Sequence, residues 1–216
     1  PALALCKAGT FQHGEQMIWK KKIDKNIKEV ELRTPPVIIR VNKFNEQAAK
    51  EFAGRIAQAQ NTGQKVVPVI IDSYGGEVYS LMSMIASIKN SKIPVATIVE
   101  GKAMSCGVIL FSCGTRGYRY ITEDATLMVH DVSSGARGKN SEIQASAKET
   151  KRLNSKIYSI LAGNSNKSER WFEKKITKRG RSDWFLDPEE AIKLGLADHV
   201  GMPRLEIKVK LDIDLV

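Results

Sequence analysis

A serine among small neighbours is the first candidate for chemistry in this sequence. Ser105 lies in the stretch GKAMSCGVILF (101–111), where it follows an apolar run and opens a short helical pattern. A serine at the first turn of a helix is most often an N-cap. The same position can present a reactive hydroxyl, because the positive helix end and the next backbone N–H, that of Cys106, stabilise a developing oxyanion. The spacing differs from the G-x-S-x-G elbow of α/β-hydrolases, so the segment alone leaves both interpretations open.

An activated serine needs a general base, and histidine is the usual one because its ordinary pKa lies near neutrality. The chain has three histidines. His13 lies in a polar leader, and a surface position is expected for His199. His130 ends the apolar run ATLMVH (125–130), and a lone histidine there is more often a core residue with satisfied hydrogen bonds. Its place at the end of a predicted strand nevertheless makes His130 the candidate base.

Alternating apolar and amphipathic stretches predict the elements that position these two residues. Strands are predicted at 37–41, 66–72, 95–101 and 125–130, and helices at 45–60 and 77–90. Strands that alternate with helices indicate an α/β fold with a mostly parallel sheet. Ligand sites in such sheets lie outside the carboxyl ends of the strands, where both DSYGG (72–76) and the Ser105 segment are expected.

Length and composition indicate one compact, soluble domain. The chain has 216 residues, of which 42% are hydrophobic and 27% charged. No apolar run reaches the roughly 20 residues of a membrane span, and the first residues lack the pattern of a signal peptide. The odd number of cysteines and the lack of CxxC spacing argue against disulfides and a zinc site. We therefore expect a cytoplasmic protein with free thiols, no membrane association and no metal.

The formal net charge of +10 raises the question of a nucleic-acid partner. The densest basic runs are KKK (20–22) and EKKITKRGR (173–181). Neither is interleaved with aromatic residues on which bases stack, and no nucleic-acid-binding motif accompanies them. These runs are predicted to be solvated faces or interfaces for an acidic partner protein, not nucleic-acid sites.

Several motifs, taken in chain order, resemble the proteolytic subunit family of the Clp protease (ClpP) over residues 36–201. The SYGG turn (73–76) is similar to the family's SPGG, AMSCG (103–107) to AASMG, and MVHD (128–131) to MIHQ. An aspartate then precedes WFL, and EEAIKLGLAD follows. The chain departs from the family pattern at Tyr74, where the family has proline, and at Asp131, where it has glutamine.

The resemblance assigns roles to the candidate residues. It implies that Ser105 is the nucleophile, that His130 is the general base and that Asp183 orients the imidazole of His130. From the residues alone, Asp131, Asp187 and Asp198 are equally open as the orienting acid.

The resemblance also places the oxyanion hole at the backbone N–H groups of Gly76 and Cys106. The glycine pair before it suits a tight turn and a close substrate approach, although an ordinary turn would use it too. The thiol of Cys106 is weighed as an alternative nucleophile, but the family places serine at the reacting position, so Cys106 and Cys113 are expected to be small apolar fillers.

The resemblance implies a ClpP/crotonase-type α/β fold of repeated ββα units with a projecting handle helix. A domain is expected over 36–216, preceded by an N-terminal segment, 1–35, in the position of the family's axial loops. Residues 133–166 match the glycine-rich strand and long helix of the handle. Six apolar residues of that helix are expected to need a partner subunit: Ile143, Ala147, Leu153, Ile157, Ile160 and Leu161.

The expected function is therefore that of a serine endopeptidase without a cofactor. The resemblance implies heptameric rings, stacked as a tetradecamer, that cleave peptides and unfolded proteins delivered by an AAA+ unfoldase. Two alternatives remain open at this point: a protease of the viral head-maturation type with the same fold, and a ring subunit that only scaffolds. A signal-peptide peptidase usually pairs serine with lysine, and the presence of His130 argues against it.

Overall fold

The computed structural model describes residues 35–206. Residues 36–202 form one compact unit, to which the following description refers. The predicted axial-loop segment, His13 and the 20–22 basic run lie outside the described residues. The expected domain boundary at residue 36 stays a prediction.

The described residues form seven strands and six helices, and the four strands and two helices with predicted ranges lie close to those ranges. The strands are β1 (Ile39–Val41), β2 (Val67–Ser73), β3 (Val95–Met104), β4 (Arg119–Ile121), β5 (Thr126–Val129), β6 (Trp184–Leu186) and β7 (His199–Val200). The helices are α1 (Glu46–Gln60), α2 (Val78–Lys89), α3 (Cys106–Ser112), α4 (Asn140–Gly163), α5 (Trp171–Lys178) and α6 (Pro188–Leu194).

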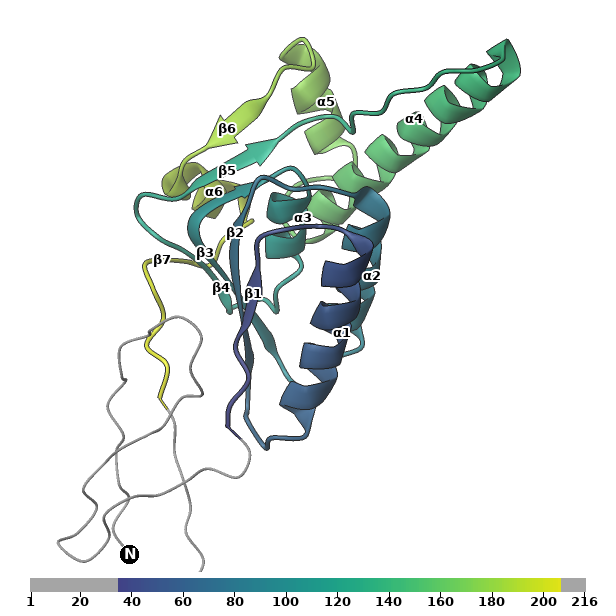
Figure 1. The fold of residues 1–216 in the computed structure, drawn as a ribbon. Helices are drawn as coiled ribbons and strands as arrows, with labels where there is room; N and C mark the ends of the chain where they lie inside the picture. Colours follow the sequence, from purple (N-terminus) through teal and green to yellow (C-terminus); the bar gives the residue numbers. More distant parts are fainter. Residues whose placement is uncertain (1–34, 207–216) are drawn as a thin grey trace, which may run out of the picture. The chain divides into compact units, whose positions relative to one another are not determined.

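The strands form one mostly parallel sheet, as predicted. Its main path is β1-β2-β3-β4-β7, and every neighbouring pair along it is parallel. At its carboxyl end β3 continues beyond β4 and pairs instead with β5, also in parallel. The remaining strand, β6, runs antiparallel to β5. The observed architecture is the mixed α/β fold that the sequence predicts (Figure 1).

The core lies between the sheet and the helices packed on one of its faces (Figure 1). The first five residues of β2 and of β3 are mostly apolar and all buried, which is usual for central parallel strands. Helix α1 begins after Asn45, whose side chain accepts a hydrogen bond from the Ala48 N–H. Its buried face consists of Ala49, Phe52, Ile56 and Ala59, at the spacing of a helix stripe.

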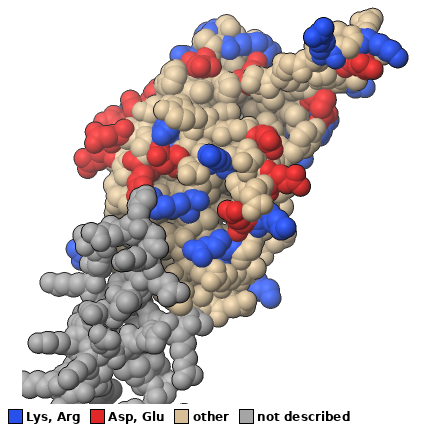
Figure 2. Space-filling view, in the orientation of Figure 1, with Lys and Arg blue, Asp and Glu red and all other residues tan. Residues whose placement is uncertain are grey.

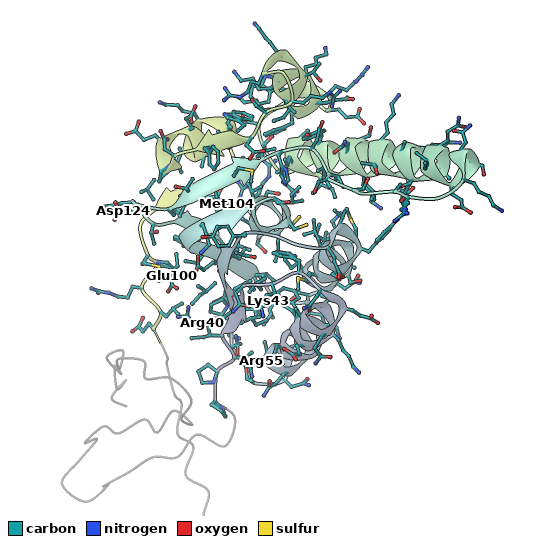
Figure 3. All side chains as sticks on the ribbon, turned by 45° about the horizontal axis from the view of Figure 1, so that its top comes forward. Arg40, Lys43, Arg55, Glu100, Met104 and Asp124 are labelled. Carbon is teal, nitrogen blue, oxygen red and sulfur yellow. The ribbon has the colours of Figure 1, made fainter. Side chains whose placement is uncertain are left out.

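The opposite face of the sheet carries ion pairs near the carboxyl ends of the strands. Arg40 on β1 donates to Glu100 on β3 at 2.8 Å (Figure 3), and Lys102 donates to Asp72 on β2 at the same distance. Both pairs are largely solvent-exposed and therefore contribute little to stability. They mark the polar rim of the sheet on which the candidate site is built.

Helix α4 projects from the body of the chain, as expected for a handle (Figure 1). The expectation that its apolar residues all need a partner subunit is wrong for Leu153, Ile157 and Leu161. These three are buried inside the chain because the base of α4 packs on the core. In the outer half of the helix, the large apolar residue Ile143 is 43% exposed, as the expectation of a partner subunit requires.

The predicted handle strand is absent from the described structure. Residues 132–138 form no strand and run along α4 instead (Figure 1). Asn154 Oδ1 accepts a 2.6 Å hydrogen bond from the Val132 N–H, and the Ser134 and Thr150 hydroxyls lie 2.7 Å apart. Two hydrogen bonds thus tie the first part of this segment to α4.

Both signs of charge occur over the visible face of the unit (Figure 2). Basic groups are seen around α5 and at the free end of α4, each with acidic groups nearby. Over the described residues, none of the helices is long and apolar enough to cross a membrane.

Candidate active site

Ser105 follows directly after the last residue of β3 and precedes α3. It occupies the N-cap position, but its side chain makes no capping hydrogen bond, so the capping interpretation is wrong. Its backbone has φ 54° and ψ −120°, a conformation that non-glycine residues rarely adopt. Such strain persists only where the surroundings impose it, and it is concentrated at functional sites.

The surroundings that impose this conformation come from two neighbouring strands. The Ser105 N–H donates to the Met128 carbonyl of β5 at 2.9 Å, which continues the parallel pairing of Met104 with Met128. On the other side lies the turn after β2. There the buried Ser73 hydroxyl donates to the Asn42 carbonyl at 2.9 Å and accepts from the Gly75 N–H at 3.1 Å.

The glycine pair of this turn is required by sterics as well as by conformation. Gly75 has φ +106°, and a Cβ there would lie 2.7 Å from the Cβ of Ser105. Gly76 has φ +151°, and a Cβ there would lie 2.5 Å from the Phe44 carbonyl oxygen. The turn therefore packs directly against Ser105, at a distance that only a glycine allows.

The pairing of β5 with β6 explains how His130 meets Asp183. Val129 pairs with Trp184, and continuing this antiparallel register by one residue sets His130 opposite Asp183. The Nδ1 atom of His130 lies 3.9 Å from Oδ1 of Asp183. This separation permits an electrostatic interaction but exceeds the length of a hydrogen bond. The His130 side chain is 25% exposed and that of Asp183 is 55% exposed.

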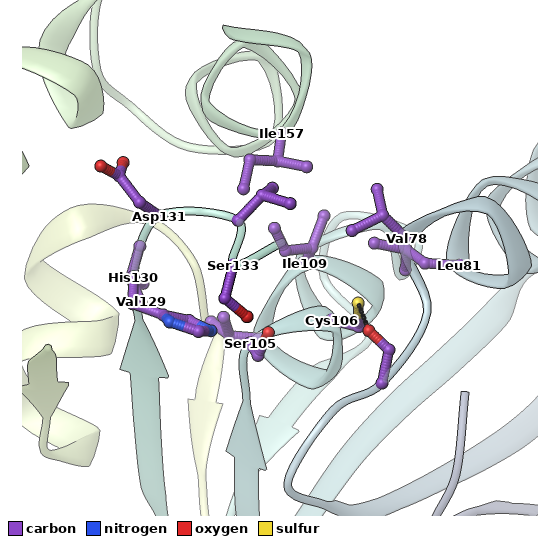
Figure 4. A pocket seen from close by; sticks show the side chains of 13 residues that line it. Val78, Leu81, Ser105, Cys106, Ile109, Val129, His130, Asp131, Ser133 and Ile157 are labelled. Atoms are coloured by element: carbon purple, nitrogen blue, oxygen red, sulfur yellow. Dashed lines mark hydrogen bonds between the residues drawn. The ribbon is translucent and has the colours of Figure 1, made fainter. Parts of the chain in front are cut away.

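The other three candidate acids are engaged elsewhere. Asp187 is the N-cap of α6 and accepts from the Glu190 N–H at 2.7 Å. Asp198 forms a bidentate ion pair with Arg119 at the opposite end of the sheet. Asp131 accepts from Tyr158 and Arg181, and in Figure 4 its carboxylate points away from the imidazole. Among the four candidate acids of the sequence, Asp183 is the one whose carboxylate lies within 4 Å of a ring nitrogen of His130.

Ser105 and His130 line one pocket, which is shown in Figure 4. The imidazole of His130 extends toward Ser105 in this view. The neighbouring wall of the pocket is mostly apolar and is formed by Val78, Leu81, Ile109, Val132 and Ile157. The pocket also includes Ser133, whose position the sequence did not point to.

Cys106 is buried next to Ser105, and its thiol is occupied. The thiol donates to the Gly76 carbonyl at 3.1 Å (Figure 4). Burial raises the pKa of Cys106 to about 11, so the thiolate needed for nucleophilic attack is scarce at neutral pH. As the first residue of α3, Cys106 has a backbone N–H that the helix leaves without a partner. Cys106 is therefore better suited to donate a hydrogen bond from its backbone N–H than to act as a nucleophile.

The remaining histidine of the described region lies apart from this site. His199 is exposed on β7, stacks on Tyr120 and lies within 3.1 Å of the Gly117 carbonyl. Within residues 35–206, no three His, Cys, Asp or Glu side chains are grouped so as to hold a metal ion. The surface position predicted for His199 is confirmed.

Comparison with known proteins identifies the family of this chain. The family model for Clp protease matches residues 24–204. A curated relative, the ATP-dependent Clp protease proteolytic subunit of Deinococcus radiodurans, is 32% identical over 145 residues, which cover 67% of this chain and 69% of the relative. The chain belongs to the Clp protease family and is a serine-type peptidase, a hydrolase.

Proposed function

We propose that Ser105, His130 and Asp183 form the catalytic triad of this peptidase. The observation that supports the triad best is the strained Ser105 at the end of β3. It lies beside β5, which leads into His130, and His130 lies opposite Asp183 when the β5–β6 register is continued by one residue. In the proposed reaction, the Ser105 oxygen attacks the peptide carbonyl carbon while His130 takes the hydroxyl proton. His130 then gives that proton to the leaving amine, and water releases the acyl group by the same steps.

The proposal gives two backbone amides the task of stabilising the oxyanion. The N–H groups are those of Gly76 and Cys106, which lie on the two sides of the contact between the glycine turn and α3. Removing one such donor in other serine peptidases costs about a hundredfold to a thousandfold in kcat. The proposal also requires the His130–Asp183 separation of 3.9 Å to shorten by about 1 Å when substrate binds, since a hydrogen bond needs ~2.7–3.2 Å.

The assembled form that we propose is a ring of identical subunits, stacked through α4 as two heptamers. Family membership and the projecting, exposed outer half of α4 support this assembly. The relative's name describes an ATP-dependent protease, and we assign the ATP-driven step here to a separate AAA+ unfoldase that delivers unfolded chains. The proposed location is the cytoplasm.

The experiment that tests this function compares the wild-type chain with Ser105→Ala. A short fluorogenic peptide should be cleaved by the wild type without ATP, and an unfolded protein should be degraded only when a Clp-type ATPase and ATP are added. Ser105→Ala should lose both activities and keep the same mass in sedimentation. Full activity of a monomer would contradict the ring, and activity of Ser105→Ala would contradict the triad.

A further inference from the structure

Asp131, next to the proposed base, is held by side chains from two other parts of the chain. Its Oδ1 accepts a hydrogen bond of 2.5 Å from the Tyr158 hydroxyl of α4. Its Oδ2 accepts a hydrogen bond of 2.7 Å from the guanidinium of Arg181, in the loop between α5 and β6. We call these three residues the carboxylate clamp. The clamp joins three segments that are separated along the chain by more than 20 residues.

The clamp lies where the pairing of β5 and β6 ends. The last paired residues are Val129 and Trp184, and beyond them the two strands run on through His130 and Asp183. The Asp131–Arg181 ion pair joins the same two segments just beyond His130 and Asp183. It therefore closes the open end of the strand pair, with the proposed base and acid on the inner side of the closure.

The third member ties this closure to α4. Tyr158 is 2% exposed, and burial, followed by the hydrogen bond to Asp131, raises the pKa of its hydroxyl. The hydroxyl consequently stays protonated and keeps donating at any pH where the enzyme works. Asn154, one turn earlier on the same face of α4, accepts from the Val132 N–H. Helix α4 thus holds the two residues that follow His130, one by its side chain and one by its backbone.

The backbone at the Arg181 end of the clamp is strained and is held in place by its contacts. Arg181 has φ 58° and follows Gly180, which has φ 70°. Two consecutive residues shortly before Asp183 therefore have positive φ angles. An arginine in this conformation is unfavourable and persists only where its surroundings hold it there. The Arg181 N–H donates to the Ile176 carbonyl at 3.0 Å, and its side chain bonds to Asp131. These contacts fix the segment that carries Asp183.

We propose that Asp131 is a positioning residue for the peptidase reaction. Bound by Tyr158 and Arg181, its carboxylate sets the separation of His130 from Asp183 and links that separation to the position of α4. This role rests on the triad proposed above, because it acts through His130 and Asp183. The 3.9 Å between His130 Nδ1 and Asp183 Oδ1 must shorten for a hydrogen bond to form, so a shift of the clamp would change whether that bond forms. A misplacement of about 1 Å can cost about a hundredfold in rate.

The test compares Asp131→Asn with a matched control on α4. Glu149 of α4 accepts from the Tyr79 hydroxyl at 2.6 Å and forms an ion pair with Arg152, so Glu149→Gln removes a carboxylate with the same kinds of partner away from His130. With a short fluorogenic peptide, Asp131→Asn should lower kcat about tenfold or more and leave KM within about threefold. Phosphonylation of Ser105 by a fluorophosphonate should slow in parallel. Glu149→Gln should keep kcat within about twofold.

Two conservative variants separate positioning from a general loss of folding. Tyr158→Phe removes one hydroxyl and leaves the ion pair, and it should lower kcat about threefold to tenfold even if Asp131→Asn does not fold. Arg181→Lys keeps one cation at that position and should retain more kcat than Arg181→Gln. Both comparisons are made on variants whose thermal unfolding has been measured.

Wild-type-like kcat in both Asp131→Asn and Tyr158→Phe would overturn the positioning role. So would losses of kcat that simply follow the fall in unfolding temperature across all variants, Glu149→Gln included. In either case a dead Ser105→Ala would leave the triad standing. Activity of Ser105→Ala would remove the triad and the positioning role together.

Discussion

Replacing Gly75 by alanine tests whether the turn after β2 holds Ser105 in its strained conformation. Gly75 has φ +106°, and an added Cβ would lie 2.7 Å from the Cβ of Ser105 and 3.0 Å from the Met104 carbonyl oxygen. Carbon atoms in ordinary contact are ~3.5–4.0 Å apart, so the serine or the turn must move by about 1 Å. The turn has little freedom to move, because Ser73 anchors it to Asn42.

The expected effect of Gly75→Ala is larger on activity than on stability. A positive φ at a non-glycine residue costs on the order of 1–3 kcal/mol of unfolding free energy. A displacement of the nucleophile by about 1 Å should lower kcat by about a hundredfold. Urea denaturation gives the first quantity, and hydrolysis of a short fluorogenic peptide at saturating concentration gives the second.

Gly63→Ala is the matched control for this experiment. Gly63 has φ +77°, but a Cβ there would meet no atom within 4 Å. It should lose stability of order 1 kcal/mol through backbone strain and keep kcat within about twofold. A folded Gly75→Ala enzyme with kcat within about threefold of wild type would refute the steric argument.

Three further predictions concern the thiol, a buried ion pair and the core. Because burial raises the pKa of Cys106 to about 11, iodoacetamide at pH 8 should modify this thiol slowly in the folded chain and rapidly in denaturant, as followed by mass spectrometry; equally fast modification in both states would contradict the burial. Burial alone would raise the pKa of Asp198, but the hydrogen bonds and charge of Arg119 outweigh burial and lower this pKa below its ordinary value. The pair therefore stabilises the fold above about pH 4, the unfolded-state pKa of an aspartate. Its contribution is lost as the pH falls through the folded-state pKa of Asp198. Asp198→Asn should therefore cost about 3 kcal/mol at pH 7, since it strands the buried Arg119, and the difference in denaturant midpoint should shrink toward zero in acid; a penalty that is independent of pH would contradict the sign. Leu161→Ala should cost about 2–5 kcal/mol because Leu161 is fully buried at the base of α4, and a loss under 1 kcal/mol in urea denaturation would mean that this helix is not packed as described.

The fold was predictable from sequence because its main signals are local. The apolar runs of β2 and β3 and the stripe of α1 follow simple periodicities, and they gave these elements to within a few residues. The handle strand expected within 133–166 came from the family resemblance and not from such a local pattern, and residues 132–138 form no strand. Whether an extended segment pairs or runs along a helix depends on distant residues such as Asn154 and Thr150.

The candidate site was only partly predictable for the same reason. His130 at a strand end and Ser105 before a helix are local signals. The choice of Asp183 over Asp131 depends on the β5–β6 register, which pairs residues about 50 positions apart, and only the family resemblance supplied it. Nothing in the sequence at position 105 predicts the positive φ of Ser105, although the glycine pair at 75–76 indicated a tight turn nearby.

The carboxylate clamp is a third case of long-range structure. An acidic residue beside the base was visible in the sequence, but its partners were not. Tyr158 and Arg181 lie 27 and 50 positions away from Asp131. Tyr158 belongs to no motif, and Arg181 was noted only as the last residue of the basic run 173–181. Arginine with a positive φ has no sequence signature that could have drawn attention to it.

The most direct test of the central claim is the site of modification by a fluorophosphonate. The wild-type chain is treated with the probe at neutral pH, digested and analysed by mass spectrometry, with His130→Ala treated in parallel. The account predicts one phosphonyl group on Ser105 in the wild type and almost none in His130→Ala. Labelling of Cys106 or of another hydroxyl, or undiminished labelling of Ser105 without His130, would contradict it.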